Sequence, residues 1–191
     1  MPYQWVPPEL LLEYNGVAVY HCYRRGAGAY GKFSKGLYRV QQFSKVEMYA
    51  YTTRETSNAV HQHFLSMEEK LWQSLKIPYR VLEMCSGDLG GMAVRKYDLE
   101  AWMPGKGEHG DWGEVTSTSN TTDYQARRMN IRYRRDSDKK LEILHTLNGT
   151  AFAISRAIIA ILENYQQADG SILIPEVLQK WLGKDKITLK K

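Results

Sequence analysis

Cysteine is scarce in this chain, and Cys22 and Cys85 are the only two among 191 residues. Two cysteines cannot build a disulfide framework, so we expect a reducing compartment. No apolar run is long enough to span a bilayer, and residues 1–14 carry prolines and acidic groups where a targeting peptide needs cations and an apolar core. We therefore expect a soluble protein with no membrane contact, in the cytoplasm or, as the alternative, in the mitochondrial matrix.

Several catalytic and metal-binding motifs are also missing. The chain has no G-x-S-x-G elbow, and its cysteines and histidines lack zinc-ligand spacing. The segment 26–33, GAGAYGKF, does satisfy G-x-x-x-x-G-K, but Phe33 stands where a phosphate loop needs Ser or Thr, and a strand is predicted to follow. None of these chemistries is supported, so we expect His61 and His63 to be solvated and both cysteines to be core thiols.

The composition describes an ordinary folded domain. The chain is 43% hydrophobic and 25% charged, which predicts a single domain with a substantial core. Its net charge of +5 permits a polyanionic partner such as RNA or a nucleotide without requiring one. The basic tail at 184–191 is predicted to be mobile.

The pattern of elements predicts an α+β fold in which helices flank an antiparallel sheet. Strands at 15–23 and 37–51 form a hairpin around a glycine-rich loop. A helix capped by Thr56 or Ser57 ends before Pro78. One face of this helix is apolar, formed by Val60, Phe64, Met67, Leu71 and Leu75. Further strands are predicted at 79–85, 96–103, 114–119, 130–135 and 141–146, followed by a helix at 150–165 that is apolar all round and therefore buried.

Polar residues in two of these segments point to a site. Arg156 lies within the apolar helix, and a buried arginine is costly unless an anion or a carboxylate pairs with it. Asn148 and Thr150 stand where that helix is predicted to begin. In the run 114–120, EVTSTSN, Glu114 shares a strand face with the threonines, and Ser117 lies on the opposite face unless a bulge turns it.

A basic run lies between these two segments, at Arg127, Arg128, Arg132, Arg134 and Arg135. The run can contact RNA, or it can be a solvated surface whose arginines pair with nearby acids. The second interpretation is the commoner one for charge runs.

With these residues in view, the chain resembles the catalytic domain of the seryl-tRNA synthetase family, which belongs to the class II aminoacyl-tRNA synthetases. CYRRGAGAYG followed by GLYRVQQFSKVEM is similar to the family's motif 2. HTLNGTAFAISRAIIAILEN is similar to its motif 3, and KYDLEAWMPG and EVTSTSNTTDYQARRMNIRYR are similar to the core between them. The resemblance runs from about residue 14 to residue 183, so we expect residues 1–183 to be an incomplete catalytic core.

The resemblance implies that the chain binds ATP. Arg24 would hold the α-phosphate while the serine carboxylate attacks it, and Arg39 would add a cation near the phosphates. Arg156 would hold the bent triphosphate and cover one face of the adenine, with Phe43 on the other face.

The resemblance also implies a serine site and a metal. Glu47 would contact the polar groups of L-serine, while Asn148 and Thr150 would help to recognise its hydroxyl. Glu114 and Ser117 would help to hold the Mg²⁺ that bridges the phosphates. The implied product is seryl-tRNA(Ser), and the implied assembly of the complete protein is a homodimer.

Two departures from the family pattern accompany the resemblance. The motif 2 acid, which is associated with the adenine amino group, is replaced by Gly26. The tRNA-binding arm, motif 1 and the Thr-x-Glu segment of the serine ammonium site are missing. We therefore expect a fragment or a truncated product with weak activity on its own. The alternative is a catalytically degenerate paralogue that acts as a binding or regulatory partner.

Overall fold

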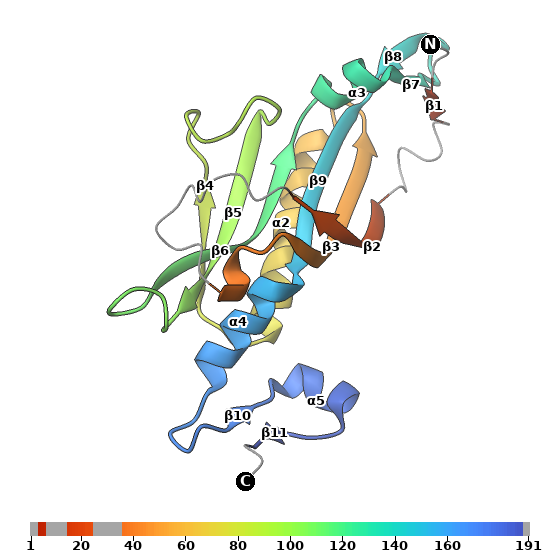
Figure 1. Cartoon of the computed structure of the whole chain (residues 1–191). Coiled ribbons are helices and arrows are strands. Elements are labelled where there is room, and N and C mark those ends of the chain that lie inside the picture. Colours follow the sequence, from red (N-terminus) through yellow and green to blue (C-terminus); the bar gives the residue numbers. More distant parts are fainter. Residues whose placement is uncertain (1–3, 7–14, 25–35, 189–191) are drawn as a thin grey trace.

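A six-stranded antiparallel sheet forms the body of the molecule (Figure 1). The computed structural model describes residues 4–6, 15–24 and 36–188, so the glycine-rich loop with Gly26 lies outside the described residues. The strand order is β2-β3-β9-β6-β5-β4. The strands span Asn15–Tyr23 (β2), Gln42–Thr52 (β3), Tyr79–Glu83 (β4), Arg95–Met103 (β5), Asp111–Asn120 (β6) and His145–Ala153 (β9). The predicted fold class, an antiparallel sheet flanked by helices, is confirmed.

The predicted hairpin is confirmed, with one difference. β2 and β3 pair antiparallel from Asn15–Ala50 to Tyr23–Gln42. The second strand was expected from residue 37, but Gly36–Tyr38 form a short 3-10 helix (η1) and β3 begins only at Gln42. A positive φ of 60° at Gly36 suits a glycine and starts this turn.

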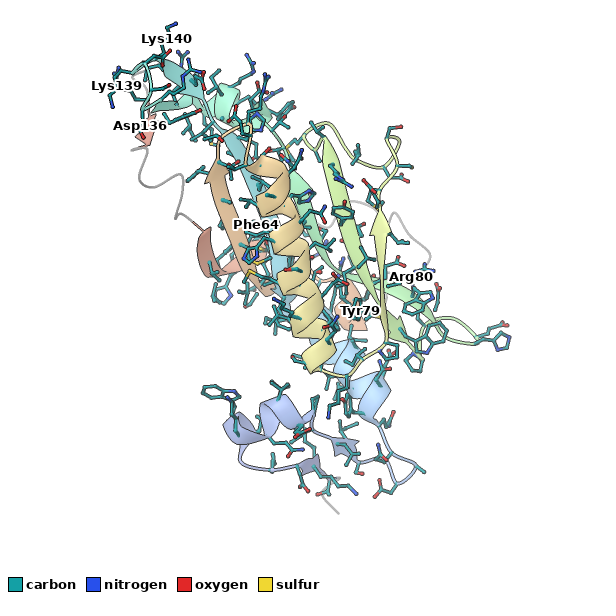
Figure 2. All side chains as sticks on the ribbon, turned by 180° about the vertical axis from the view of Figure 1, so that it is seen from behind. Phe64, Tyr79, Arg80, Asp136, Lys139 and Lys140 are labelled. Carbon is teal, nitrogen blue, oxygen red and sulfur yellow. The ribbon has the colours of Figure 1, made fainter. Side chains whose placement is uncertain are left out.

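Helix α2 (Ser57–Ser74) lies across the back of the sheet (Figure 2). It contacts β9, β6, β3 and β5. Phe64 packs there with Met48, Ala50 and Leu147 in a buried cluster. The predicted apolar face does pack on the sheet, but the buried side of α2 also carries polar residues that were not predicted. These are Ser57, His61 and Glu68.

The predicted solvated and core positions need correction at three residues. His61 is 0% exposed and stacks at 5.2 Å from the ring of Tyr97, so the expectation of a solvated His61 was wrong, whereas His63 is exposed. Burial lowers the pKa of His61. The thiols were expected in the core, but Cys85 is exposed and Cys22 is half-buried.

Two bulges shape the front of the sheet. Leu99 pairs with Thr116 and Glu100 with Glu114, so Val115 is an extra residue in β6. Between β3 and β9, Val46 pairs with Phe152 and Glu47 with Thr150, which leaves an extra residue at position 151.

The predicted helix at 150–165 was wrong in its first turn. Strand β9 continues to Ala153, and helix α4 occupies Ile154–Tyr165. Asn148 and Thr150 therefore lie on a strand and not at a helix entrance. Nor is α4 buried all round, because its Ile158 is 42% exposed.

α4 seals one end of the sheet with small residues. Its Ala157 and Ala160 pack against Trp72 of α2 and Leu99 and Val115 of the sheet. This cluster is the larger part of the core, and it fixes α4 directly beside the β6 bulge.

Smaller units flank the sheet at both ends (Figure 1). Near the N-terminal side, β1 (Gln4–Val6), β7 (Ile131–Arg134) and β8 (Leu141–Ile143) form a three-stranded sheet next to α3 (Tyr124–Met129). At the other end, β10 (Ile172–Leu173) and β11 (Lys186–Ile187) pair beside α5 (Glu176–Leu182). The start of the basic tail is thus in a strand and not mobile as predicted. Among the described residues, no helix has the length and apolar character needed to cross a membrane.

Candidate functional site

A hollow of about 120 Å³ opens on the front of the sheet, between β3, β6, β9 and the start of α4. Six of the nine predicted site residues line it: Arg24, Phe43, Glu114, Ser117, Thr150 and Arg156. The β6 bulge explains how Glu114 and Ser117 come to share the hollow. Without the extra Val115, an odd spacing of three residues would place them on opposite faces.

Arg156 is the most strongly held cation of the hollow. Its side chain is 19% exposed, and its Nη1 donates to the carbonyl oxygen of Glu114 at 2.9 Å and lies 3.3 Å from that residue's Oε2. The guanidinium also lies over the Tyr38 ring, 4.8 Å from its centroid. A carboxylate thus pairs with this half-buried arginine, which is one of the two kinds of partner that the sequence analysis allowed.

Arg24 lines the same hollow. Its guanidinium lies 5.2 Å from the centroid of the Phe43 ring, and its Nε donates to the carbonyl oxygen of Val40 at 2.6 Å. Burial lowers the pKa of Arg24, and the charges of Arg39 and Arg156 lower it further. Two guanidiniums therefore line one small volume, and the charge of Arg39 acts on one of them, which is an environment that attracts a polyanion. Arg39 itself is exposed and does not line the hollow.

Glu47 organises a polar cluster beside the hollow. It is 3% exposed, and Lys45 Nζ lies 2.6 Å from its Oε2. Thr150 Oγ1 donates to the same oxygen at 2.8 Å, while Asn148 Nδ2 donates to Oε1 at 3.2 Å. The three predicted serine-site residues are thus in mutual contact, and Thr150 joins their cluster to the hollow.

Two residues of the site were missed by the sequence analysis. Lys45 lines the hollow and pairs with Glu47. Strand alternation gave a signal for it, because Phe43, Lys45 and Glu47 follow one another at a period of two. Tyr38, which supports Arg156, had been placed on a strand, and its position on η1 left no period to follow.

The oxygen donors at Glu114 and Ser117 suit a hard cation such as Mg²⁺, which prefers carboxylate and hydroxyl oxygens together with substrate phosphates. Within residues 4–6, 15–24 and 36–188, no group of three or more His, Cys, Asp or Glu side chains can hold a metal ion. The two oxygen donors of Glu114 and Ser117 suit an ion that takes much of its coordination from a bound phosphate group and water.

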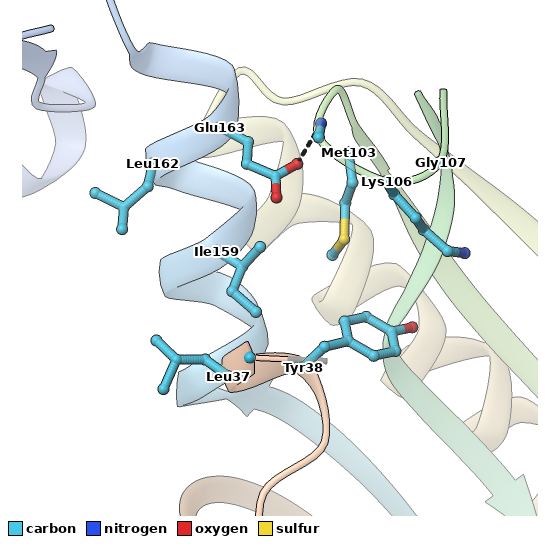
Figure 3. Close-up of a pocket in the computed structure, with 10 residues that line it drawn as sticks. Leu37, Tyr38, Met103, Lys106, Gly107, Ile159, Leu162 and Glu163 are labelled. Carbon is cyan, nitrogen blue, oxygen red and sulfur yellow. Dashed lines mark hydrogen bonds between the residues drawn. The ribbon is translucent and has the colours of Figure 1, made fainter. Parts of the chain in front are cut away.

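A larger cavity, of about 560 Å³, adjoins the hollow along η1 and α4 (Figure 3). Leu37, Met103 and Ile159 give it an apolar lining. Glu163 accepts a hydrogen bond from the backbone N–H of Gly105 at 2.8 Å, so this acid is engaged in holding the β5–β6 turn against α4. The convergent charged groups lie in the smaller hollow and not in this cavity.

The basic run is distributed over α3, β7 and the turn that follows. Arg127 pairs with Asp123 at 2.5 Å, and Arg135 pairs with Asp138 at 2.8 Å and with Glu142 at 2.9 Å. These pairs support the interpretation of a solvated surface with neighbouring acids.

Comparison with known protein families matches residues 4–165 to the tRNA synthetase class II core domain (G, H, P, S and T). The chain belongs to this class II synthetase family. A serine--tRNA ligase from Treponema denticola is 62% identical over 178 residues, which are 93% of this chain and 41% of that protein. A serine--tRNA ligase from Rhodopirellula baltica is 58% identical over 177 residues, again 93% of this chain and 41% of that protein.

Solved class II synthetases share the fold. Seryl-tRNA synthetase from Pyrococcus horikoshii, crystallised with ATP, superposes with a TM-score of 0.85 at 51% identity, over 92% of this chain and 38% of that chain. The cytoplasmic serine-tRNA ligase of Naegleria fowleri, in complex with AMP, gives a TM-score of 0.86 at 36% identity, over 98% of this chain and 44% of that chain. The chain therefore spans about two fifths of the length of these synthetases, and the predicted resemblance to seryl-tRNA synthetases is confirmed.

Proposed function

We propose that this chain is the ATP- and serine-binding part of a serine--tRNA ligase, which joins serine to ATP as seryl-adenylate and then transfers it to tRNA(Ser). The observation that carries the proposal is the contact between two sites. The arginine-lined hollow shares Thr150 with the cluster of Glu47, Asn148 and Lys45. A phosphate-binding volume thus adjoins buried hydrogen-bonding groups of a size suited to a small polar amino acid.

The arginines are proposed to align the nucleotide. Arg24 and Arg156 line one hollow, and the charge of Arg39 acts on Arg24. In the reaction, a serine carboxylate oxygen bonds to the α-phosphorus of ATP while the bond to pyrophosphate breaks. This step needs alignment and charge neutralisation and no protein nucleophile. On binding, adenine would take the face of Phe43 that Arg24 covers, with Arg156 on its other side.

Serine selection is proposed to rest on Glu47, Asn148 and Thr150. A pocket that selected by size alone would reject alanine weakly, whereas buried groups left without a partner penalise an analogue that lacks the hydroxyl. Glu47 is held by three donors on two sides, so its carboxylate is fixed before substrate arrives.

Glu114 and Ser117 are proposed to hold Mg²⁺ together with the nucleotide phosphates. When bound, the ion would neutralise phosphate charge. Glu114 is already oriented by Arg156, whose guanidinium lies 3.3 Å from its Oε2, so the metal site and the phosphate arginine are coupled. In the complete gene product, tRNA(Ser) and a second copy of the protein are the proposed macromolecular partners.

Nucleotide binding and serine activation test the proposal separately. We expect the 191-residue chain to bind Mg·ATP by calorimetry and to bind Mg·GTP more weakly. We expect the complete gene product to catalyse serine-dependent exchange of pyrophosphate into ATP, with alanine as the control amino acid, and the 191-residue chain to show weak exchange or none. A complete product that binds Mg·ATP but exchanges pyrophosphate with no amino acid contradicts the proposal.

A degenerate paralogue is the second candidate, and it is favoured by Gly26 in place of the motif 2 acid. The variant Gly26→Glu distinguishes the two. If the native complete product charges tRNA and the variant only tightens ATP binding, the protein is an enzyme with a weakened adenine contact. If the native product is inactive and the variant restores charging, the degenerate interpretation is correct.

A further inference from the structure

The sheet divides behind the proposed ATP and serine sites. Strands β6 and β9 pair over three residues only, and the pairing ends at Thr118 and Gly149. Beyond that point, β6 borders the hollow with Glu114 and Ser117, and β9 borders it with Thr150. The position of this fork therefore sets the distance between the metal and phosphate ligands on one strand and the serine ligands on the other.

A buried carboxyl group lies at the fork, on the side of α2. Glu68 is 0% exposed, and its Oε2 accepts a hydrogen bond from Thr116 Oγ1 at 3.1 Å. Its Oε1 lies 2.9 Å from the place that a Cβ on Gly149 would occupy. The Oγ1 of Thr118 lies equally close to that place, so the carboxyl group fills the space where the last paired residues of β6 and β9 meet.

An acid at this position needs a physical reason. Glu68 shares the buried side of α2 with Phe64, Leu65 and Trp72, where an apolar residue would avoid the cost of dehydrating a carboxyl group. Burial raises its pKa to about 9, so it is a neutral acid at physiological pH. A neutral carboxyl group can bond Thr116 and fit against the bare backbone of Gly149 at the same time, which a branched aliphatic side chain cannot do.

The contact with Thr116 reaches the front of the sheet directly. Thr116 lies between Val115, the bulge residue, and Ser117 in the hollow. A bulge is held by few ladder bonds, because the extra residue has no cross-strand partner. The bond from the back therefore replaces part of the support that the bulge removes, and it keeps Glu114 and Ser117 on the same face.

We propose that Glu68 is a positioning residue, which wedges β6 and β9 apart at Thr118 and Gly149 and, through Thr116, holds Glu114 and Ser117 in the hollow. The inference rests on the proposed function only for the identity of the ligands held there. It assigns a role to a residue that touches neither nucleotide nor serine.

The first test compares Glu68→Gln with Glu68→Ala in the 191-residue chain. Glu68→Gln keeps a neutral side chain of the same shape, and we expect its dissociation constant for Mg·ATP to stay within about twofold. Glu68→Ala removes the wedge, and we expect this constant to rise about tenfold, since displacement of positioned groups by less than 1 Å is costly. Hydrogen exchange should show lost amide protection at 114–118 in Glu68→Ala alone.

Leu65→Ala is the matched control, because Leu65 is buried on the same helix and is not among the nearest neighbours of the Cβ position at Gly149. It should lose stability by a comparable amount and keep both Mg·ATP affinity and amide protection at 114–118. Equal effects of Leu65→Ala and Glu68→Ala on these two readouts would overturn the proposal, since Glu68 would then be an ordinary core residue.

A double-mutant cycle tests the wedge without any ligand. Gly149→Ala places a methyl group against Glu68 Oε1, and we expect a marked loss of stability in the native background. In the Glu68→Ala background the clash with Glu68 Oε1 is removed and only the clash with Thr118 remains, so the loss should be smaller. Equal losses in the two backgrounds contradict the wedge. A wild-type chain that fails to bind Mg·ATP refutes the proposed function. In that case the double-mutant cycle and the hydrogen exchange at 114–118 still test whether Glu68 positions the strands.

Discussion

Two buried glutamates lie on opposite faces of the same sheet, and they are held in opposite ways. Glu47, on the front, is 3% exposed and has a lysine at 2.6 Å and two hydrogen-bond donors. Glu68, on the back, is 0% exposed and accepts one hydrogen bond, from Thr116. Among the described residues its Oε1 has no hydrogen-bond partner. Burial and the charges of Glu47 and Asp98 raise the pKa of Glu68 to about 9.

The difference teaches how one fold separates chemistry from support. A carboxylate surrounded by donors can serve as a substrate contact, because its lone pairs are oriented before binding. A neutral carboxyl group behind the strands offers no charge to a ligand, and it can serve as a spacer that donates or accepts a neutral hydrogen bond. A substitution that removes only the charge should therefore impair function at Glu47 and have little effect at Glu68. A substitution that removes side-chain volume should have the larger effect at Glu68.

The largest effect is expected at the front, for Arg156→Ala. The change removes the guanidinium that faces the hollow and leaves Glu114 without its cation. We expect Mg·ATP affinity to fall about a hundredfold, because the phosphates would lose a charged hydrogen-bond donor. Isothermal calorimetry on the 191-residue chain measures it. Arg127→Ala, an exposed arginine paired with Asp123, is the control and should leave affinity unchanged. ATP binding that survives Arg156→Ala, or RNA binding as the only measurable affinity, would show that the hollow is not a nucleotide site.

The second prediction removes charge from each glutamate in turn. In the complete gene product, Glu47→Gln should lower kcat/KM for serine about thirtyfold, because the change weakens a fixed, charge-assisted contact and leaves Lys45 without its partner. Glu68→Gln should change it by less than about twofold. Serine-dependent pyrophosphate exchange measures both. Similar losses in the two variants would mean that the back carboxyl is charged, and the contrast between the faces would disappear.

The third prediction concerns pH. The unfolded Glu68 loses its proton near the ordinary pKa of 4.5, while the folded residue keeps it up to about 9. Deprotonation therefore favours the unfolded chain, and the stabilising effect of this group is lost as pH rises from about 4.5 to about 9. Urea midpoints at several pH values should show wild-type stability falling relative to Glu68→Gln, by at most about 1.4 kcal/mol per pH unit. Parallel pH profiles for the two proteins would contradict a neutral buried acid.

The front of the molecule was far more predictable from sequence than the back. Arg156 was found because a cation in an apolar helix is costly, and the hairpin residues were found because motif 2 is specific. Ser117 faces the hollow only because of the β6 bulge, which the sequence analysis named as a condition but could not predict. Bulges depend on cross-strand register, which a single strand does not encode.

The back was missed for a related reason. Helical spacing correctly selected Phe64 and Leu75 as buried residues, but it gave no sign that His61 and Glu68 are also fully buried on α2. A rule that places apolar residues inside cannot detect a polar group whose partner lies on a strand 48 positions away. The length of β9 was likewise hidden, because its end at Ala153 is set by pairing with Lys45 and not by local propensity.

The smallest effects are expected for a matched pair of threonines, one on each side. Thr150 donates to Glu47 on the front at 2.8 Å, and Thr116 donates to Glu68 on the back at 3.1 Å. Each Thr→Val change removes a hydroxyl with little change in volume. Thr116→Val should cost about 1 kcal/mol of stability and leave the KM for serine within about threefold, since one neutral hydrogen bond is lost. Thr150→Val should cost no more stability but raise the KM for serine about tenfold, because a charged acceptor faces the substrate there. Urea unfolding and pyrophosphate exchange measure the two quantities. If the KM for serine rose more in Thr116→Val than in Thr150→Val, the assignment of the serine contacts to the front of the sheet would be wrong.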